Sequence, residues 1–337
     1  MANLITNYMG LELKNPLILG ACNLTFDFDT AKRLEDAGIS AIVFKSLFEE
    51  QINLESLKME EDLQEYNERN AEMVRLFPSL KHAGPAEHLE KIRQLKKTVG
   101  IPVIGSLNCI HSSTWVEYAQ ELEKTGVDAL ELNFYTTPGD FDQTPLQLED
   151  EQVKILKEVK EKVKIPVSVK LSPFYTNPLN LIKKMDAAGA NGFVLFNNLY
   201  QPEIDAEKQE MTFPFNLSQT GDYRLPLRYA GLLRKRVKGS ICSNSGIFTG
   251  HDVIRLLLAG ADAVQIVSTV YRNKAAYITQ MLKDIEDWMK RKGYSSVDEF
   301  RGKLSNVNSK DPYAYTRAQY VDLLMQPFDI MKKYPQV

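Results

Sequence analysis

Cysteine is scarce in this sequence, and its few cysteines lie far apart. The 337 residues include only Cys22, Cys109 and Cys242, and no two of them have a C-x-x-C spacing. Because a disulfide framework, a zinc site or an iron–sulfur cluster needs several closely placed cysteines, the sequence predicts none of these within the chain. Scattered, reduced cysteines are typical of the cytosol, so we expect a cytoplasmic protein without a bound metal.

Charge of one sign and long hydrophobic runs are also missing. The 41 Lys and Arg residues nearly balance the 44 Asp and Glu residues, which gives a net charge of −3. No long-range field therefore favours nucleic acid or an anionic membrane. Residues 1–16 lack a basic stretch followed by an apolar one, and no segment is apolar over the length of a membrane span. We expect a soluble protein that acts on a small molecule.

Apolar runs of strand length recur along the chain. Four of them follow a glycine that stands where a helix would end, and three others alternate with these four. With one more run near the N-terminus, the runs lie at 15–21, 36–44, 100–108, 124–132, 164–172, 187–195, 238–246 and 258–266. Amphipathic stretches with helical spacing, as at 113–124 and 151–163, separate most of them.

This alternation predicts an α/β fold with a parallel sheet. Eight strand–helix units in a chain of this length favour closure into a TIM (β/α)8 barrel over an open doubly wound sheet. We expect a single domain over residues 1–337, with the barrel at about 15–292 and a C-terminal extension at 293–337. Insertions follow strand 2 (47–86) and strand 6 (199–223) and leave the C-terminal ends of these strands, where they are predicted to wall a pocket.

The side chains that face the barrel interior follow from the alternation of faces along a strand. In the run 167–171 the apolar residues share one face, so Ser168 and Lys170 share the other and point inward. The residues predicted to meet at the mouth are Lys45, Asn108, Asn133, Lys170 and Asn197. Two lysines there indicate an anionic or electron-rich ligand, because lysine is rarely buried without a partner. Alternatively, each lysine pairs with an internal carboxylate such as Glu131 or reaches solvent, and the asparagines cap turns.

Two adjacent segments have the pattern of a phosphate site. Residues 243–252 and 264–273 each read as a strand, then small residues, then the start of a helix. They follow strands 7 and 8, where barrels commonly bind phosphate through backbone N–H groups. The alternative is that Ser and Gly end these strands for local reasons alone.

Eight motifs, in their order and spacing, carry a family resemblance. They read NPLILGAC, AIVFKS, ELN, VSVKLSP, FVLFNN, LSQTGDYRLPLR, NSGIFTGHD and LAGADAVQIVST. From about residue 3 to residue 290 the sequence resembles the dihydroorotate dehydrogenase family of FMN-binding barrels. The resemblance implies a flavoprotein oxidoreductase of pyrimidine biosynthesis that converts dihydroorotate to orotate and passes electrons to an acceptor. It also implies a homodimer, and the branch that uses quinone is disfavoured because no membrane-associating extension precedes the barrel.

The resemblance further implies the roles of individual residues. Residues near the flavin would be Ala21, Cys22, Lys45, Ser46, Asn108 and Asn133, and Lys170 would lie at its N1/O2 edge. Its phosphate would be held by Ser245, Gly246, Ser268 and Thr269, mainly through backbone N–H groups. The substrate would contact Asn133, Asn197 and Asn198, and the predicted catalytic residues are Lys45 and Thr136.

The stretch ELNFYTTPGD (131–140) departs from the family at the catalytic base. In the family a Cys or Ser removes the C5 proton of dihydroorotate at the position that here falls on Thr136, or on Thr137 if Pro138 is aligned to the family's proline. A threonine hydroxyl is a weak base and needs a neighbouring proton acceptor or a water chain. We interpret His111 as an ordinary loop residue and Cys22 as a small buried residue.

A second departure lies in the insertion after strand 2. The family commonly has an Asn-x-Met-Gly-Leu-x-Asn segment there, whereas residues 59–79 read as a charged amphipathic helix in which only Asn70 could replace an amide. The sequence thus leaves three hypotheses open. The protein oxidises dihydroorotate with an unusual base, acts on a different substrate, or is a flavin-binding module with little turnover.

Overall fold

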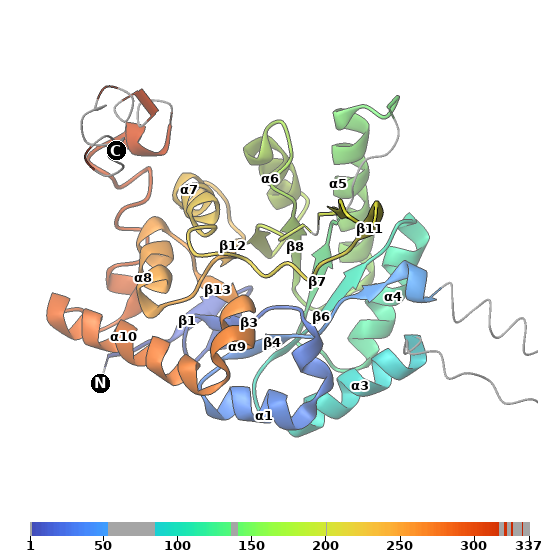
Figure 1. Ribbon diagram of the computed structural model, residues 1–337, viewed down its shortest axis with the longest axis horizontal. Helices are drawn as coiled ribbons and strands as arrows, with labels where there is room; N and C mark the ends of the chain where they lie inside the picture. Colours follow the sequence, from blue (N-terminus) through green and yellow to red (C-terminus); the bar gives the residue numbers. More distant parts are fainter. Residues whose placement is uncertain are drawn as a thin grey trace, which may run out of the picture.

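Eight parallel strands close into a barrel surrounded by helices (Figure 1). The computed structural model describes residues 2–52, 85–135, 141–199 and 201–316, with residues 320, 321, 325 and 332. The barrel strands are β3 (Leu17–Leu19), β4 (Ala41–Val43), β6 (Val103–Asn108), β7 (Ala129–Asn133), β8 (Val167–Leu171), β9 (Gly192–Leu195), β12 (Ser240–Asn244) and β13 (Ala263–Ile266). The barrel closes because β4 pairs with both β3 and β6. The predicted TIM barrel is confirmed, and each predicted apolar run overlaps one strand.

Helices follow the strands and lie on the outside of the barrel (Figure 1). They are α1 (Phe28–Asp36), α3 (Pro85–Thr98), α4 (Ser112–Lys124), α5 (Pro145–Lys162), α6 (Pro178–Ala187), α7 (Arg224–Leu233), α8 (Gly250–Ala259), α9 (Ser268–Asn273) and α10 (Ala276–Lys292). Helix α5 begins earlier than its predicted apolar pattern, because Thr144 and Gln147 form a capping box and Pro145 occupies the first helical turn. None of the helices within the described residues combines the length and apolar character that a bilayer crossing requires.

Each of the four glycines predicted to end a helix has a positive φ. These are Gly38, Gly126, Gly189 and Gly260, with φ values of 115°, 87°, 93° and 132°. The positive φ reverses the chain after the helix and leads it into the next strand, a conformation that costs a side-chain-bearing residue free energy.

The apolar core has an outer and an inner part. The outer part lies between strands and helices and includes Val167, Val169 and Leu171, so the predicted inward orientation of Lys170 is confirmed. The inner part lies inside the barrel and includes Ala41 and Val43. Strands β1 (Thr6–Tyr8) and β2 (Leu11–Leu13) form an antiparallel hairpin whose side chains join this inner part. The barrel interior is thus packed with apolar side chains toward the N-terminal ends of the strands, and polar side chains occupy it toward their C-terminal ends.

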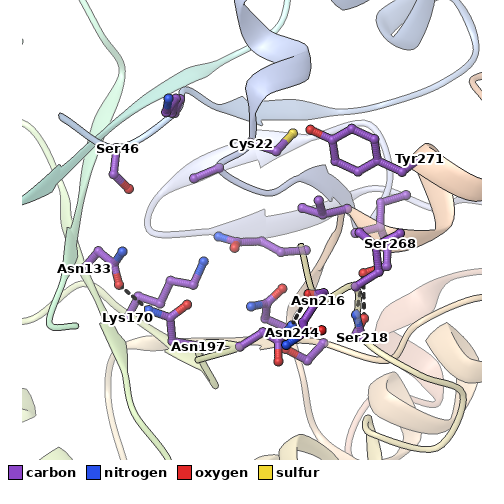
Figure 2. Close-up of a pocket in the computed structure, with 18 of the residues that line it drawn as sticks. Cys22, Ser46, Asn133, Lys170, Asn197, Asn216, Ser218, Asn244, Ser268 and Tyr271 are labelled. Carbon is purple, nitrogen blue, oxygen red and sulfur yellow. Dashed lines mark hydrogen bonds between the residues drawn. The ribbon is translucent and has the colours of Figure 1, made fainter. Parts of the chain in front are cut away.

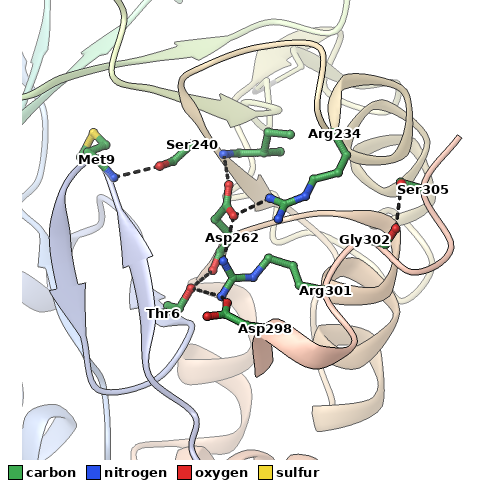
Figure 3. Close-up of polar contacts among 10 residues, drawn as sticks. Thr6, Met9, Arg234, Ser240, Asp262, Asp298, Arg301, Gly302 and Ser305 are labelled. Atoms are coloured by element: carbon green, nitrogen blue, oxygen red, sulfur yellow. Dashed lines mark hydrogen bonds and ion pairs between the residues drawn. The ribbon is translucent and has the colours of Figure 1, made fainter. Parts of the chain in front are cut away.

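A polar network fastens the segment after α10 to the base of the barrel (Figure 3). Asp262 precedes β13, and its Oδ1 accepts hydrogen bonds from Arg234 Nη1 (2.8 Å) and Arg301 Nη1 (3.2 Å). Arg301 also donates to Thr6 Oγ1 (2.8 Å) and pairs with Asp298 (2.7 Å). The segment includes the 3₁₀ turns η2 (Val297–Glu299) and η3 (Pro312–Tyr315). Three parts of the chain that are distant in sequence therefore meet at the end opposite the mouth.

The two insertions leave the barrel where they were predicted. After β4 come β5 (Leu47–Phe48), which pairs with β6, and a helical turn at 49–52. The helix predicted at 59–79 lies outside the described residues. After β9 come β10 (Glu203–Asp205) and β11 (Glu210–Thr212), an antiparallel hairpin. The 3₁₀ turn η1 (Asn23–Phe26) follows β3 at the same end of the barrel.

Candidate functional site

A cavity of about 320 Å³ lies at the C-terminal ends of the barrel strands (Figure 2), within the size range of about 300–1,000 Å³ that is usual for cofactor sites. Eleven of the predicted site residues line it: Ala21, Cys22, Lys45, Ser46, Asn133, Lys170, Asn197, Asn198, Ser245, Gly246 and Ser268. In Figure 2, Asn133, Lys170 and Asn197 lie on one side, and Ser218 and Ser268 on the other. The fold thus gathers residues that lie in or just after seven of the barrel strands.

Two predicted site residues lie behind the wall of the cavity. Asn108 donates from Nδ2 to the carbonyl oxygen of Asn133 (2.6 Å), so it holds the end of β7. Thr269 is buried, donates to the carbonyl of Phe248 (3.3 Å) and accepts from Asn273 (3.1 Å). Both side chains are satisfied by the protein. The predicted base, Thr136, and its alternative, Thr137, lie outside the described residues.

Lys170 is a buried cation at the floor of the cavity. Only 6% of the residue is exposed, and its Nζ lies 3.8 Å from Oε1 of Glu131, which is itself buried. The predicted alternative that an inward lysine pairs with Glu131 therefore holds for Lys170. Since Lys170 also lines the cavity, this pairing leaves it available to a ligand.

Lys45 has a different environment. Its Nζ lies 5.1 Å from the centroid of the Phe26 ring, and Lys91 Nζ lies 4.8 Å from the same ring. Burial lowers the pKa of Lys45, and the charge of Lys91 lowers it further. Within the described part of the chain it pairs with no carboxylate, so the alternative of an internal ion pair is wrong for Lys45 there. Among the residues that the structure describes, one of the two cationic side chains at the mouth thus has no counter-charge, which favours an anionic ligand.

Hydrogen bonds hold the asparagine side chains of the mouth in place. Asn197 donates from Nδ2 to Oδ1 of Asn133 (2.7 Å), and Asn198 donates to the carbonyl of Asn216 (3.1 Å). The first contact fixes the orientation of the Asn133 amide, whose backbone is already held by Asn108. These residues thus have a specific arrangement and do more than cap turns.

One wall of the cavity is built by the residues at the ends of β12 and β13. Ser245 and Gly246 have φ values of 77° and 70°, so the chain turns sharply after β12. Ser245 Oγ donates to the carbonyl of Phe196 (3.2 Å), and Ser268 Oγ accepts from both N and Oγ of Ser218 (3.0 and 2.8 Å). The hydroxyls are engaged within the protein, whereas the first N–H groups of α9 have no intrahelical acceptor. Backbone donors are therefore what this wall offers to an anion.

Cys22 and His111 have the environments expected of residues without a catalytic role. Burial raises the pKa of Cys22 to about 11, so its thiol is protonated at neutral pH and is a poor base. His111 does not line the cavity, its side chain is 71% exposed, and its Nδ1 contacts Glu49 Oε1 (2.5 Å). Within the described residues, no group of three or more His, Cys, Asp or Glu side chains could hold a metal ion.

Several residues of the wall were not predicted. They include Asn23, Phe48, Tyr135, Phe215, Asn216, Leu217, Ser218, Asn244, Gln265 and Tyr271. The alternation of faces in β13 could have identified Gln265, because Ala263 lies in the inner core two residues before it. Residues 215–218 belong to the insertion 199–223, so the prediction that this insertion walls a pocket is confirmed, although no signal identified the individual residues.

Comparison with known proteins gives consistent matches. The family model described as dihydroorotate dehydrogenase matches residues 77–289, more than half of the chain. The chain is 28% identical over 311 residues to "Dihydroorotate dehydrogenase B (NAD(+)), catalytic subunit" of Thermoplasma acidophilum, covering 90% of this chain and 99% of that protein. It is 30% identical over 308 residues to the protein of the same name from Pyrococcus abyssi, covering 88% and 97%. It is 22% identical over 331 residues to "Dihydropyrimidine dehydrogenase (NADP(+)), chloroplastic" of Arabidopsis thaliana, covering 87% and 75%.

Proposed function

Because this chain belongs to the dihydroorotate dehydrogenase family, an oxidoreductase family that acts on CH–CH bonds, we propose that it binds FMN at the barrel mouth and oxidises dihydroorotate to orotate. The observation that supports this most is the cavity that brings a buried lysine together with the backbone turn after β12 and the start of α9. Lys170 in β8 and Gly246 just after β12 both line it, and β9 lies between these two strands.

The residues present fit FMN at both ends. The hydroxyls of Ser245 and Ser268 already have protein partners, so the donors left for an anionic phosphate are the backbone N–H groups at Gly246 and at the start of α9. An electron-rich ring edge suits the Lys170 ammonium, whose positive charge stabilises negative charge on a reduced ligand. When bound, FMN supplies the hydride acceptor.

The substrate would be oriented by the paired amides of Asn133 and Asn197. Asn133 and Asn197 are held against each other, so their remaining amide atoms are pre-oriented toward the cavity that both line. Thr136 is the proposed site of proton removal from C5 of dihydroorotate, with Thr137 as the alternative. Lys45 is the other proposed catalytic residue, since it borders the same cavity and has no carboxylate partner in the described part of the chain.

Two features of the relatives bear on electron transfer and assembly. Their names contain NAD(+) and "catalytic subunit". We therefore propose NAD+ as the final electron acceptor, reached through a second kind of subunit. The homodimer and the cytoplasmic location remain predictions.

Oxidation or reduction of a different pyrimidine ring is the second candidate function. It is favoured by the threonines that stand where the family has Cys or Ser, and by the match to a protein named dihydropyrimidine dehydrogenase. The cavity and its amides would serve a related cyclic amide equally well.

Anaerobic stopped-flow absorbance of the FMN-loaded protein tests these functions. Bleaching of the flavin on mixing with dihydroorotate, with orotate formed in equal amount, is the expected result. Bleaching by dihydrouracil or another dihydropyrimidine in its place would establish the second function. An oxidised spectrum with every such substrate, while dithionite still bleaches it, would rule out both reactions. Failure of the apo protein to quench added FMN would contradict cofactor binding itself.

A further inference from the structure

A buried carboxylate lies directly beneath the cavity, although it does not line it. Glu131 is 1% exposed and belongs to β7. Its Oε1 lies 3.8 Å from Lys170 Nζ, and its Oε2 accepts a hydrogen bond of 2.5 Å from Gln265 Nε2. Both partners line the cavity. Glu131 thus contacts two residues that border the proposed flavin site and is separated from that site by them.

The two contacts of Glu131 are of different kinds. The contact with Gln265 is a hydrogen bond, whereas 3.8 Å exceeds the usual donor–acceptor range of about 2.7–3.2 Å. Oε1 of Glu131 is buried and accepts no hydrogen bond from the described residues. Glu131 therefore attracts Lys170 by charge alone, and the N–H donors of the ammonium are not taken up by this carboxylate.

The negative charge of Glu131 opposes the positive charge that Lys170 presents to a ligand. In a site shielded from water, charges a few ångströms apart interact far more strongly than in bulk solvent. Reduction of a flavin adds negative charge near Lys170. A carboxylate behind the lysine must then make that reduction less favourable than the lysine alone would.

We propose that Glu131 is a positioning residue that holds the Lys170 ammonium at the cavity floor and, through its own charge, lowers the reduction potential of the flavin. The inference rests on the proposed binding of FMN and concerns a residue outside the catalytic machinery. Gln265 is the neutral support that orients the carboxylate, leaving Oε1 toward the lysine.

Glu131→Gln is the informative variant, because it removes the charge and keeps the shape. Gln265 can reverse its amide and accept a hydrogen bond with its Oε1, which is a buried atom without a partner in the described part of the chain. The carbonyl of the new glutamine then remains toward Lys170. Glu117→Gln, the same change on the exposed face of α4, is the matched control.

The experiment measures the two-electron midpoint potential of bound FMN by anaerobic titration against reference dyes. Glu131→Gln should increase the ratio of affinities for reduced and oxidised flavin at least tenfold, a rise of about 30 mV for a two-electron couple. Glu117→Gln should leave the potential unchanged. In a Lys170→Met background the effect of Glu131→Gln should differ from its effect in the unaltered protein, since part of it acts through the lysine.

Three results would overturn the inference. A change in the affinity ratio below twofold in Glu131→Gln, a fall in potential, or an equal effect with and without Lys170 would each do so. If Glu131→Gln does not fold, Glu131→Asp is the second variant, because it keeps the charge but withdraws it from the lysine. Glu131→Asp should raise the potential, with an increase in the affinity ratio of less than tenfold. No rise in potential would count against the proposal. Absence of FMN binding by the unaltered protein would overturn the proposed function as well, whereas bound flavin with unchanged potentials would overturn the role of Glu131 alone.

Discussion

The buried carboxylate of Glu49 accepts four hydrogen bonds from the loop and helix start that follow β6, among them one of 2.5 Å that involves the exposed imidazole of His111. Glu49 lies just after β5, where the insertion after strand 2 begins. This contact therefore ties the base of the insertion to the start of α4.

The Glu49–His111 contact should make stability depend on pH in two directions. The hydrogen bond to Glu49 and then its charge raise the pKa of His111 above 6.5. Burial alone would raise the pKa of Glu49, but hydrogen bonds from the His111 side chain and from backbone N–H groups outweigh it and lower that pKa below 4.5. The His111 contribution is therefore present below pH 6.5 and lost as pH rises through its folded pKa, whereas that of Glu49 is lost as pH falls through its folded pKa.

His111→Gln tests this dependence. Its unfolding temperature should fall furthest below that of the unaltered protein at about pH 5.5, and the difference should shrink toward pH 9. Thermal unfolding at several pH values measures it. In a Glu49→Gln background the same substitution should have little effect on the pH profile; an equal pH-dependent loss there would show that the two residues are not coupled.

Replacement of each loop threonine by valine should identify the proton acceptor. Valine keeps the branched shape and removes the hydroxyl, so the variant at the true position should reduce flavin with dihydroorotate about 100-fold more slowly or worse. The other variant should reduce flavin at a rate near that of the unaltered protein. Both variants should bind FMN with unchanged affinity. Stopped-flow rates for Thr136→Val and Thr137→Val provide the comparison, and unchanged rates in both would exclude a role for either hydroxyl.

Gly246→Ala should weaken FMN binding, because the added methyl group would collide with a neighbouring segment in addition to straining the backbone. An added Cβ would lie 2.5 Å from the backbone N of Tyr223 and 2.8 Å from that of Asp222, so the two segments could not keep their approach. We expect FMN affinity to fall more than tenfold, measured by quenching of flavin fluorescence. Gly293→Ala is the matched control, because its φ is similar (75°) and nothing lies within 4 Å of the new Cβ. It should cost about 1 kcal/mol of stability and leave FMN binding intact.

Asp262→Asn should destabilise the fold without affecting the mouth. The substitution leaves Arg301, whose side chain is 8% exposed, without one of its two carboxylates, and we expect a loss of about 3 kcal/mol in the free energy of unfolding. Glu121→Gln breaks an exposed pair with Lys124 and should cost under about 0.5 kcal/mol. Urea denaturation compares the two. A similar small loss in both would mean that the base network contributes little.

The barrel could be predicted because its signals are local. Strand runs, helix-ending glycines such as Gly126 and alternating faces all act over a few residues, so they can be read from the sequence directly. The inward orientation of Lys170 followed from parity alone. The cavity wall was predicted only in part: residues such as Ser218 reach it through a loop whose path depends on packing, and Asn108 faces the right direction but is used to hold Asn133.

The sequence by itself determined the class of fold, the family resemblance and the gathering of lysines and asparagines at one end of the barrel. These follow from the order and periodicity of residues, which are present in the unfolded chain. Only the tertiary structure decided that Lys170 has a buried counter-charge while Lys45 lies against an aromatic ring. Burial and charge pairing depend on distances between residues far apart in sequence, and no local pattern encodes those distances.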